Sequence, residues 1–166
     1  YHLALGSTQD RAHRLAESKP TAGCGLPQVI VAEQQTAGRG RGEHLWWTGA
    51  GSLAFSILFD PACFGLGKHP LPQSSLAAGV AVIDAVGQHC FPLFPGLHWP
   101  NDVFVDGRKL SGILIDVRAD GRHVLGIGMN VNNSMADAPE EVRVRAVSLI
   151  ELAGKPLDRV EVLSEL

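Results

Sequence analysis

The sequence predicts an α+β fold, in which helices pack on a mostly antiparallel or mixed sheet. Two observations predict this class. An N-terminal helical pattern is followed by strand patterns, one long helical pattern and then a run of strand patterns with no helix between them. The Asp-Gly pairs at 106–107 and 120–121 are the strongest hairpin signals in the chain, and hairpins build antiparallel sheets. The 166 residues are 45% hydrophobic and 19% charged, so we expect 1–166 to form one globular domain.

Seven segments carry the periodicity of a helix or a strand. In order they are a helix over 7–18, strands over 28–33 and 52–60, a helix over 73–90, a run of short strands over 97–132, and helices over 148–156 and 157–166. Ser7 or Thr8 is a suitable N-cap for the first helix. β-Branched residues favour the strand that follows it. Loops rich in glycine and proline are expected over 18–27 and 61–72.

Apolar residues at helical spacing mark the faces that we expect the helices to bury. These positions are Ala12, Leu15 and Ala16 in the first helix, Leu76, Val80, Ile83, Ala85 and Val86 in the long helix, and Leu157, Val160, Leu163 and Leu166 in the last. Gly154 is the expected end of the short helix before it, because glycine favours the left-handed conformation that closes a helix.

Composition and charge exclude several classes of protein. The formal net charge is −3, so no overall positive field would attract nucleic acid, and we expect no DNA binding. We expect neither a signal peptide nor a membrane span. Cys24, Cys63 and Cys90 are widely spaced without a CxxC pair, which favours free buried thiols and a cytoplasmic setting over disulfides or a zinc site.

The first cluster of residues that suggests chemistry is AGRGRGEHLWW, residues 37–47. Its glycines let the backbone approach a ligand closely, and Arg39 and Arg41 supply planar cationic donors suited to phosphate or carboxylate. Trp46 and Trp47 offer aromatic faces to a base ring. The alternative is a surface turn that happens to contain arginines. The spacing is not that of a P-loop.

The second cluster is HWPNDVFVDGRKLSGIL, residues 98–114. Pro100 is incompatible with a central strand position, so we expect a kinked strand end that projects Asn101 and Asp102. Lys109 follows the Asp-Gly turn and enters an apolar strand, where an ammonium group is costly unless it meets an anion. The alternative is a lysine on a sheet edge whose ammonium reaches solvent.

The third cluster is GIGMNVN, residues 126–132. Gly126 and Gly128 interrupt a strand, and Asn130 and Asn132 follow on one face at the spacing of two. Such asparagines can bind a sugar hydroxyl or a metal-bound water. The alternative is that they satisfy backbone groups in a bend.

Taken together, the clusters resemble those of the catalytic domain of biotin protein ligases. The resemblance is carried by STQDRAHRLA, AEQQTAGRGRGEHLW, HWPND, KLSGIL and GIGMNVN, and it covers essentially the whole chain. It implies a fold related to class II aminoacyl-tRNA synthetases. It also implies two steps: biotin attacks the α-phosphate of MgATP to give biotinyl-5′-AMP, and a lysine of a biotin carboxyl carrier domain then takes the biotinyl group. ATP, Mg²⁺ and biotin would bind here, and homodimers are common in the family.

The resemblance also implies roles for individual residues. Those matched to biotin are Ser7, Thr8, Gln35, Gly38, Arg39, Arg41, Lys109, Gly112, Ile113 and Leu114; those matched to ATP are Arg41, Trp46, Asn101, Lys109 and Asn130. Lys109 would hold the biotin carboxylate and the α-phosphate together, with Arg39 and Arg41 beside it. Trp46 would lie against adenine, and Asn130 near phosphate or Mg²⁺, with no metal ligand supplied directly by the protein.

The sequence departs from the family pattern at His98, where the family usually has lysine. Some members of the family also carry an SH3-like C-terminal domain or an N-terminal helix-turn-helix module. We expect neither module in this chain. Two other functions stay open: a lipoate or octanoate transferase of the same superfamily, and a biotin-binding module without turnover.

Overall fold

The computed structural model describes residues 1–18, 26–65 and 74–166 of the 166-residue chain. Its strands are β1 (His2–Leu5), β2 (Gln28–Gln35), β3 (Gly38–Arg39), β4 (Leu45–Trp46), β5 (Leu53–Phe59), β6 (Pro95–His98), β7 (Asp102–Val105), β8 (Arg108–Val117) and β9 (His123–Met129). Its α-helices are α1 (Thr8–Ser18), α2 (Ser74–Cys90), α3 (Glu140–Arg143), α4 (Leu149–Ala153) and α5 (Arg159–Ser164), with 3₁₀ turns at Pro61–Phe64 and Met135–Asp137. The predicted loops over 18–27 and 61–72 fall largely outside the described residues, as do Cys24 and the first residue of the helix expected over 73–90.

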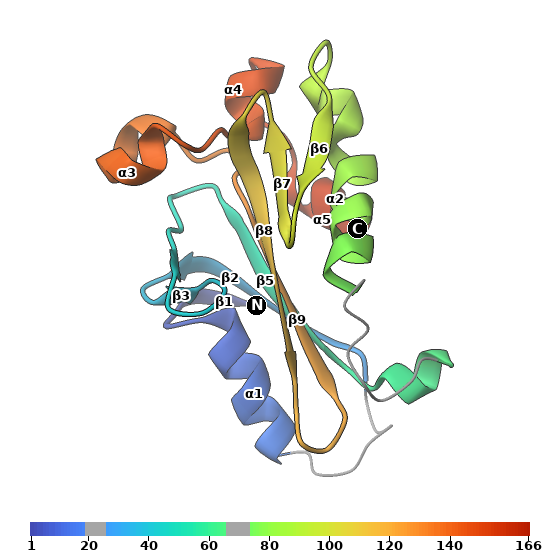
Figure 1. Cartoon of the computed structure of the whole chain (residues 1–166). Helices are drawn as coiled ribbons and strands as arrows, with labels where there is room; N and C mark the ends of the chain where they lie inside the picture. Colours follow the sequence, from blue (N-terminus) through green and yellow to red (C-terminus); the bar gives the residue numbers. More distant parts are fainter. Residues whose placement is uncertain (19–25, 66–73) are drawn as a thin grey trace.

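Seven strands form one mixed sheet in the order β1-β2-β5-β9-β8-β7-β6, and β3 and β4 form a separate hairpin (Figure 1). Among the described strands of the large sheet, only β1 and β2 pair in parallel. The predicted α+β class is therefore confirmed. The strands after α2 are not uniformly short, however, because β8 has ten residues.

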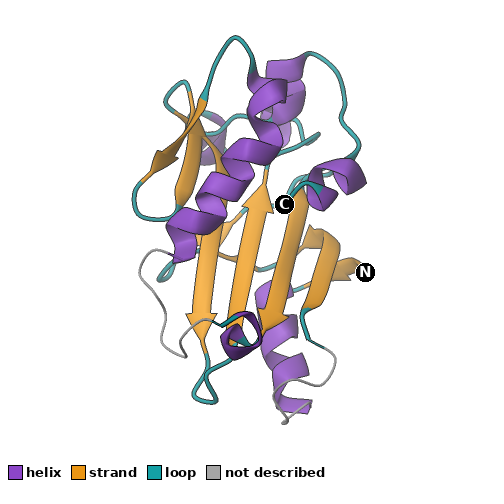
Figure 2. Cartoon of the chain, turned by 90° about the vertical axis from the view of Figure 1, so that its right-hand side faces the viewer, coloured by secondary structure: helices purple, strands orange, loops and turns teal. Residues whose placement is uncertain are grey.

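Helices cover both faces of the sheet (Figure 2). Under α1, Ala12 and Ala16 pack with Ile30, Leu58 and Val124. On the other face α2 packs on a larger core that includes Val82, Val86, Phe55, Ile113 and Met129. Successive residues of a strand face opposite sides, so β5 and β9 each contribute buried residues to both cores. No described helix is both long and apolar enough to cross a bilayer.

Two helix faces differ from the sequence prediction. Val80 in α2 and Val160 in α5 are exposed, at 45% and 74%, whereas Val82 and Val162 are buried. Leu157, Leu163 and Leu166 do pack against the core, as predicted. The buried thiol of Cys90 has its pKa raised to about 11 by burial, but Cys63 is exposed, so the expectation of buried thiols is wrong for Cys63.

Both Asp-Gly pairs lie in turns between antiparallel strands, as predicted. Asp106 and Gly107 form a two-residue turn with φ angles of 49° and 72°, between paired residues Val105 and Arg108. Because both central residues have positive φ, this is the turn geometry that Asp-Gly favours. The second pair lies in a longer loop, where Arg122 donates hydrogen bonds to Asp120 and holds the pKa of that carboxyl at about 2.

Candidate active site

A pocket opens on the α1 face of the sheet, between α1 and the β3–β4 hairpin. Its empty space, counted out to its open mouth, is about 660 Å³. The lining includes most of the residues singled out in the sequence: Ser7, Thr8, Gln35, Arg39, Arg41, Trp46, Asn101, Lys109, Gly112, Ile113 and Leu114. The structure thus brings residues from all three sequence clusters, which are far apart in the chain, to one place.

Glycines form the floor of this pocket. Gly112 of β8 is paired directly with Gly128 of β9, so the sheet carries no side chain there. The indole of Trp46 packs onto both glycines, and a Cβ at Gly128 would lie 2.6 Å from its Nε1 atom. The missing side chains are therefore what admits Trp46 to the wall of the pocket. Gly38 is buried against the Trp46 backbone instead, and it is not part of the lining.

One end of the pocket is formed by neutral polar groups at the start of α1. The Oε1 atom of Gln35 accepts hydrogen bonds from the Thr8 backbone N–H at 2.8 Å and from its hydroxyl at 3.1 Å. The Ser7 hydroxyl accepts from the Gln9 backbone N–H at 3.2 Å, which caps the helix. Ser56 of β5 lies beside Thr8, with 2.9 Å between the hydroxyl oxygens. This end can bind an uncharged ligand group with donors and acceptors of its own.

The other end carries the ammonium group of Lys109. Its Nζ lies 2.8 Å from Oδ2 of Asp102 and 5.6 Å from the centre of the Trp46 ring. Asp102 stands at the start of β7, directly after the Trp99–Pro100–Asn101 turn, and pairs in the ladder with Gly112. The sequence predicted both the projecting Asp102 and the need of Lys109 for an anion, but not that each is the other's partner.

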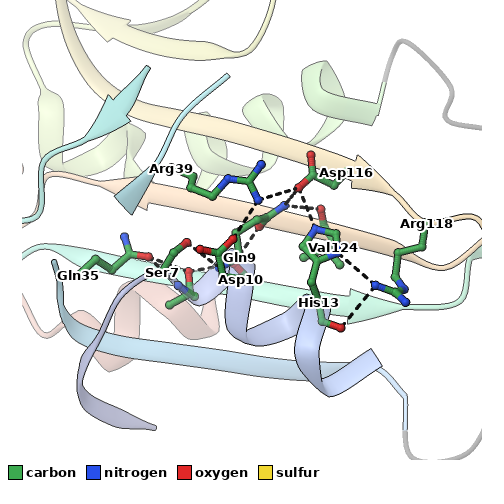
Figure 3. A network of polar contacts seen from close by, with 11 residues as sticks. Ser7, Gln9, Asp10, His13, Gln35, Arg39, Asp116, Arg118 and Val124 are labelled. Carbon is green, nitrogen blue, oxygen red and sulfur yellow. Dashed lines mark hydrogen bonds and ion pairs between the residues drawn. The ribbon is translucent and has the colours of Figure 1, made fainter. Parts of the chain in front are cut away.

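The two arginines of the Gly/Arg segment, Arg39 and Arg41, are exposed residues of the pocket lining. Figure 3 shows the Arg39 side chain beside Asp10 and Asp116. Arg39 lies in β3, where its guanidinium makes an ion pair of 3.0 Å with Asp10 of α1 and lies 3.8 Å from Asp116 of β8. These contacts connect the β3–β4 hairpin to α1 and to the sheet. The segment is therefore an anchored hairpin over the pocket rather than an isolated surface turn.

Asn101, Asn130 and His98, also singled out in the sequence, differ in whether they line the pocket. Asn101 lines the pocket, and its Nδ2 donates to the Ile113 carbonyl at 2.7 Å. Asn130 is buried outside the lining, where its Oδ1 accepts from Asn133. His98 is exposed, stacks on Phe104 with 4.3 Å between ring centres, and is not among the lining residues. Of the three, only Asn101 is in position to contact a ligand in this pocket.

The lining residues that were missed in the sequence include Gln9 and Ser56. Ser56 had a signal that could have found it, because it is the polar residue within the apolar strand LAFSILF. Gln9 follows Ser7 and Thr8 directly at the start of α1. One of its hydrogen-bond partners, Asp116, lies 107 residues away in the sequence, so no local pattern marked Gln9.

Comparison with known proteins agrees with this geometry. A model of the biotin/lipoate A/B protein ligase family matches residues 5–133. The bifunctional ligase/repressor BirA of Bacillus subtilis is 34% identical over 171 residues, covering 100% of this chain and 50% of that protein. The biotin–[acetyl-CoA-carboxylase] ligase of Mycobacterium tuberculosis is 41% identical over 145 residues, covering 83% of this chain and 50% of that protein. The chain spans about half the length of these relatives.

Solved structures show the same relationship. The biotin protein ligase from Aquifex aeolicus in complex with biotin and ATP superposes with a TM-score of 0.80 at 36% identity, covering 99% of this chain and 65% of that chain. The Leishmania major enzyme in complex with biotinyl-5-AMP gives 0.79 at 25% identity, covering 99% and 69%. Lipoate-protein ligase A bound with ATP gives 0.68 at 14% identity, a likeness of fold alone. The expected fold related to class II aminoacyl-tRNA synthetases is confirmed.

Proposed function

Because the chain belongs to the biotin/lipoate A/B protein ligase family, we propose that it activates biotin with ATP and transfers it to a protein. The product of the first step is biotinyl-5′-AMP, and the acceptor in the second is a lysine of a biotin carboxyl carrier domain. One observation carries the proposal: a single pocket has neutral hydroxyl and amide groups at one end and the Lys109 ammonium at the other. Biotin has the matching order, an uncharged ureido head and a carboxylate tail.

In the first step a carboxylate oxygen of biotin attacks the α-phosphorus of ATP. The new bond joins that oxygen to phosphorus, the bond from phosphorus to the β-phosphate oxygen breaks, and pyrophosphate leaves. Two anions must approach each other, so the barrier falls when fixed cations face the developing charge. Lys109 is the cation nearest the glycine floor, and Arg39 and Arg41 are exposed in the lining. No general base is required, since the biotin carboxylate is already ionised at neutral pH.

In the second step the uncharged amine of the carrier lysine attacks the acyl carbon of the adenylate. A carbon–nitrogen bond forms, the bond from that carbon to the phosphate oxygen breaks, AMP leaves, and the amine loses a proton to solvent. The mixed anhydride must be kept from water until the carrier arrives. Trp46, packed on the glycine floor by the β3–β4 hairpin, would cover it from one side.

Mg²⁺ would enter with the phosphates of ATP. Within the described parts of the chain, no three His, Cys, Asp or Glu side chains gather in a way that could hold a metal ion. No step above depends on a protein ligand to the metal.

The test is ATP–pyrophosphate exchange, run separately with biotin, lipoate and octanoate. We expect exchange with biotin, lost in Lys109→Ala and kept in Lys155→Ala, an exposed lysine outside the pocket lining. Exchange driven by lipoate instead, or octanoyl transfer without ATP, would establish the other activity of the superfamily. Stabilisation by biotin without exchange would identify a binding module.

A further inference from the structure

Lys109 faces the pocket because β8 is irregular beside it. Successive residues of a regular strand face opposite sides, so Lys109 and Gly112, three positions apart, would lie on opposite faces of the sheet. In the structure both line the pocket, and a Cβ at Gly112 would lie 3.2 Å from the Lys109 Nζ. Lys109 and Ser111 pair with consecutive residues of β7, which makes Leu110 the extra residue of a β-bulge. Leu110 is buried in the core under α2, and the bulge turns Lys109 to the pocket face.

The same stretch of β8 changes its neighbour on the opposite edge. The ladder between β8 and β9 begins two residues after Lys109, and at Lys109 itself the neighbour is the segment 145–147, through a parallel bridge to Ala146. The Lys109 backbone N–H donates to the Arg145 carbonyl at 2.7 Å, and its carbonyl accepts from the Val147 N–H at 3.0 Å. Figure 1 shows α3 and α4, which precede and follow this segment, beside the end of the sheet at which β8 begins. Both backbone polar groups of Lys109 are thus held by one segment.

Asn130 binds the bulge with both its backbone and its side chain. Its backbone N–H donates to the Leu110 carbonyl at 3.0 Å, and its Nδ2 donates to the Lys109 carbonyl at 3.4 Å. A carbonyl can only accept, so the nitrogen of the Asn130 amide must face Lys109. The Oδ1 atom then accepts from Asn133 at 3.1 Å, and the Asn130 carbonyl accepts from the Leu149 N–H at 3.0 Å. Asn130 therefore connects the two carbonyls of the bulge to the start of α4.

We propose that Asn130 is a positioning residue for Lys109. With the segment 145–147 it holds the bulge that directs the ammonium group into the pocket. Asn130 is 3% exposed and is not among the lining residues, so it acts through Lys109 and not by touching the nucleotide. The inference rests on the proposed function, in which Lys109 faces both reacting anions.

The effect of this positioning should appear in the rate. Displacing a reacting group by about 1 Å can cost on the order of 10²-fold, even when the substitution lies away from the chemistry. Removing the Asn130 side chain leaves its backbone N–H on Leu110 and the Val147 N–H on Lys109, so the bulge is loosened but not lost. We therefore expect slower turnover with little change in the binding of ATP.

The experiment measures kcat and the KM for ATP in biotin-dependent pyrophosphate exchange, at a temperature at which all variants are folded. Asn130→Ala should lower kcat by roughly ten- to hundred-fold and change the KM by less than about three-fold. Asn133→Ala removes only the donor that orients the Asn130 amide, so its kcat should fall by less. Asn132→Ala is the matched control, because it loses two hydrogen bonds to the Leu157 backbone instead and should keep its kcat.

A double variant shows whether Asn130 acts through Lys109. Residues that act as a unit give losses that do not add, so Asn130→Ala should lower kcat little further in a Lys109→Met background. Losses that multiply would overturn the inference. A raised KM for ATP at unchanged kcat would also overturn it, since Asn130 would then contact the nucleotide. An equal fall of kcat in Asn132→Ala would reduce the effect to a general loss of stability.

Binding of the acid separates the inference from the proposed function. Biotinol has a hydroxymethyl group in place of the carboxylate, so its calorimetric comparison with biotin reports on the Lys109 charge without any exchange. We expect the wild-type chain and Asn132→Ala to prefer biotin by roughly ten-fold or more, and Asn130→Ala to lose roughly three- to ten-fold of this preference. If these preferences hold but the wild-type chain shows no exchange, the proposed function fails and the positioning role stands. If exchange is present and Asn130→Ala changes neither kcat nor the preference, the positioning role fails alone.

Discussion

Replacing Lys109 by methionine tests whether the pocket acts through a positive charge. Methionine is similar in length and can keep the packing against Gly112 and Trp46, but it removes the ion pair of 2.8 Å with Asp102. Losing one preorganised electrostatic contact to a transition state costs about 10²–10³ in rate. We expect biotin-dependent ATP–pyrophosphate exchange to fall by about that factor, with a smaller change in the affinity for biotin.

The same substitution should also reduce stability, for a reason visible at Asp102. Its Oδ1 is already buried without a hydrogen-bond partner among the described residues, and the substitution leaves Oδ2 without Lys109. A buried polar group that loses its partner costs about 1–3 kcal/mol. Because Asp102→Asn removes the unpaired charge, the double variant should regain most of this free energy of unfolding.

Exchange assays and thermal or denaturant unfolding of the single and double variants separate the two effects. We expect the double variant to recover stability and to stay as inactive as Lys109→Met. The reasoning fails if exchange returns together with stability, because Lys109 would then serve the fold rather than the reaction. It also fails if Lys109→Met keeps more than roughly a tenth of wild-type exchange.

Three other substitutions test separate parts of the structure. Gly128→Ala would displace Trp46 from the pocket wall, so the KM for ATP should rise at least ten-fold in steady-state kinetics, with little change in melting temperature. Asp120→Asn should lower the melting temperature at neutral pH. The pKa of Asp120 is depressed to about 2, so its contribution is present above about pH 4 and is lost as the pH falls toward 2; melting curves of the two proteins should converge there. Asn132→Ala removes both hydrogen bonds to the Leu157 backbone, of 2.8 and 2.9 Å, and should cost about 1–3 kcal/mol in denaturant unfolding.

The helix faces show which part of a periodicity prediction is secure. The presence of α2 and α5 follows from their spacing of apolar residues, and it was predicted. Which residues are buried also depends on how each helix is rotated against its neighbours. That rotation exposes Val80 and Val160 and buries Val82 and Val162, which are two positions away. Local spacing cannot fix it, because the partner surface is formed by strands distant in the sequence.

The site shows the same division between local and distant information. Lys109 could be predicted because the apolar residues around it make an unpaired ammonium costly within one short segment. The partners of Gln9 could not, since Ser56 and Asp116 lie 47 and 107 residues away and meet it only through the register of β5, β9 and β8. A motif of adjacent residues can be predicted from the sequence alone. A cluster that strand pairing assembles from distant residues can be recognised only when the register of the sheet is known.

Under the proposed function, a chain with a net charge of −3 has to bind two anionic substrates. Two of the pocket's cations are not surplus charges, because Lys109 is paired with Asp102 and Arg39 with Asp10. These carboxylates hold the cations in place at short range, and they also weaken the attraction for anions at long range. The affinity must then come from contacts made inside the pocket, where charge interactions are stronger than in water.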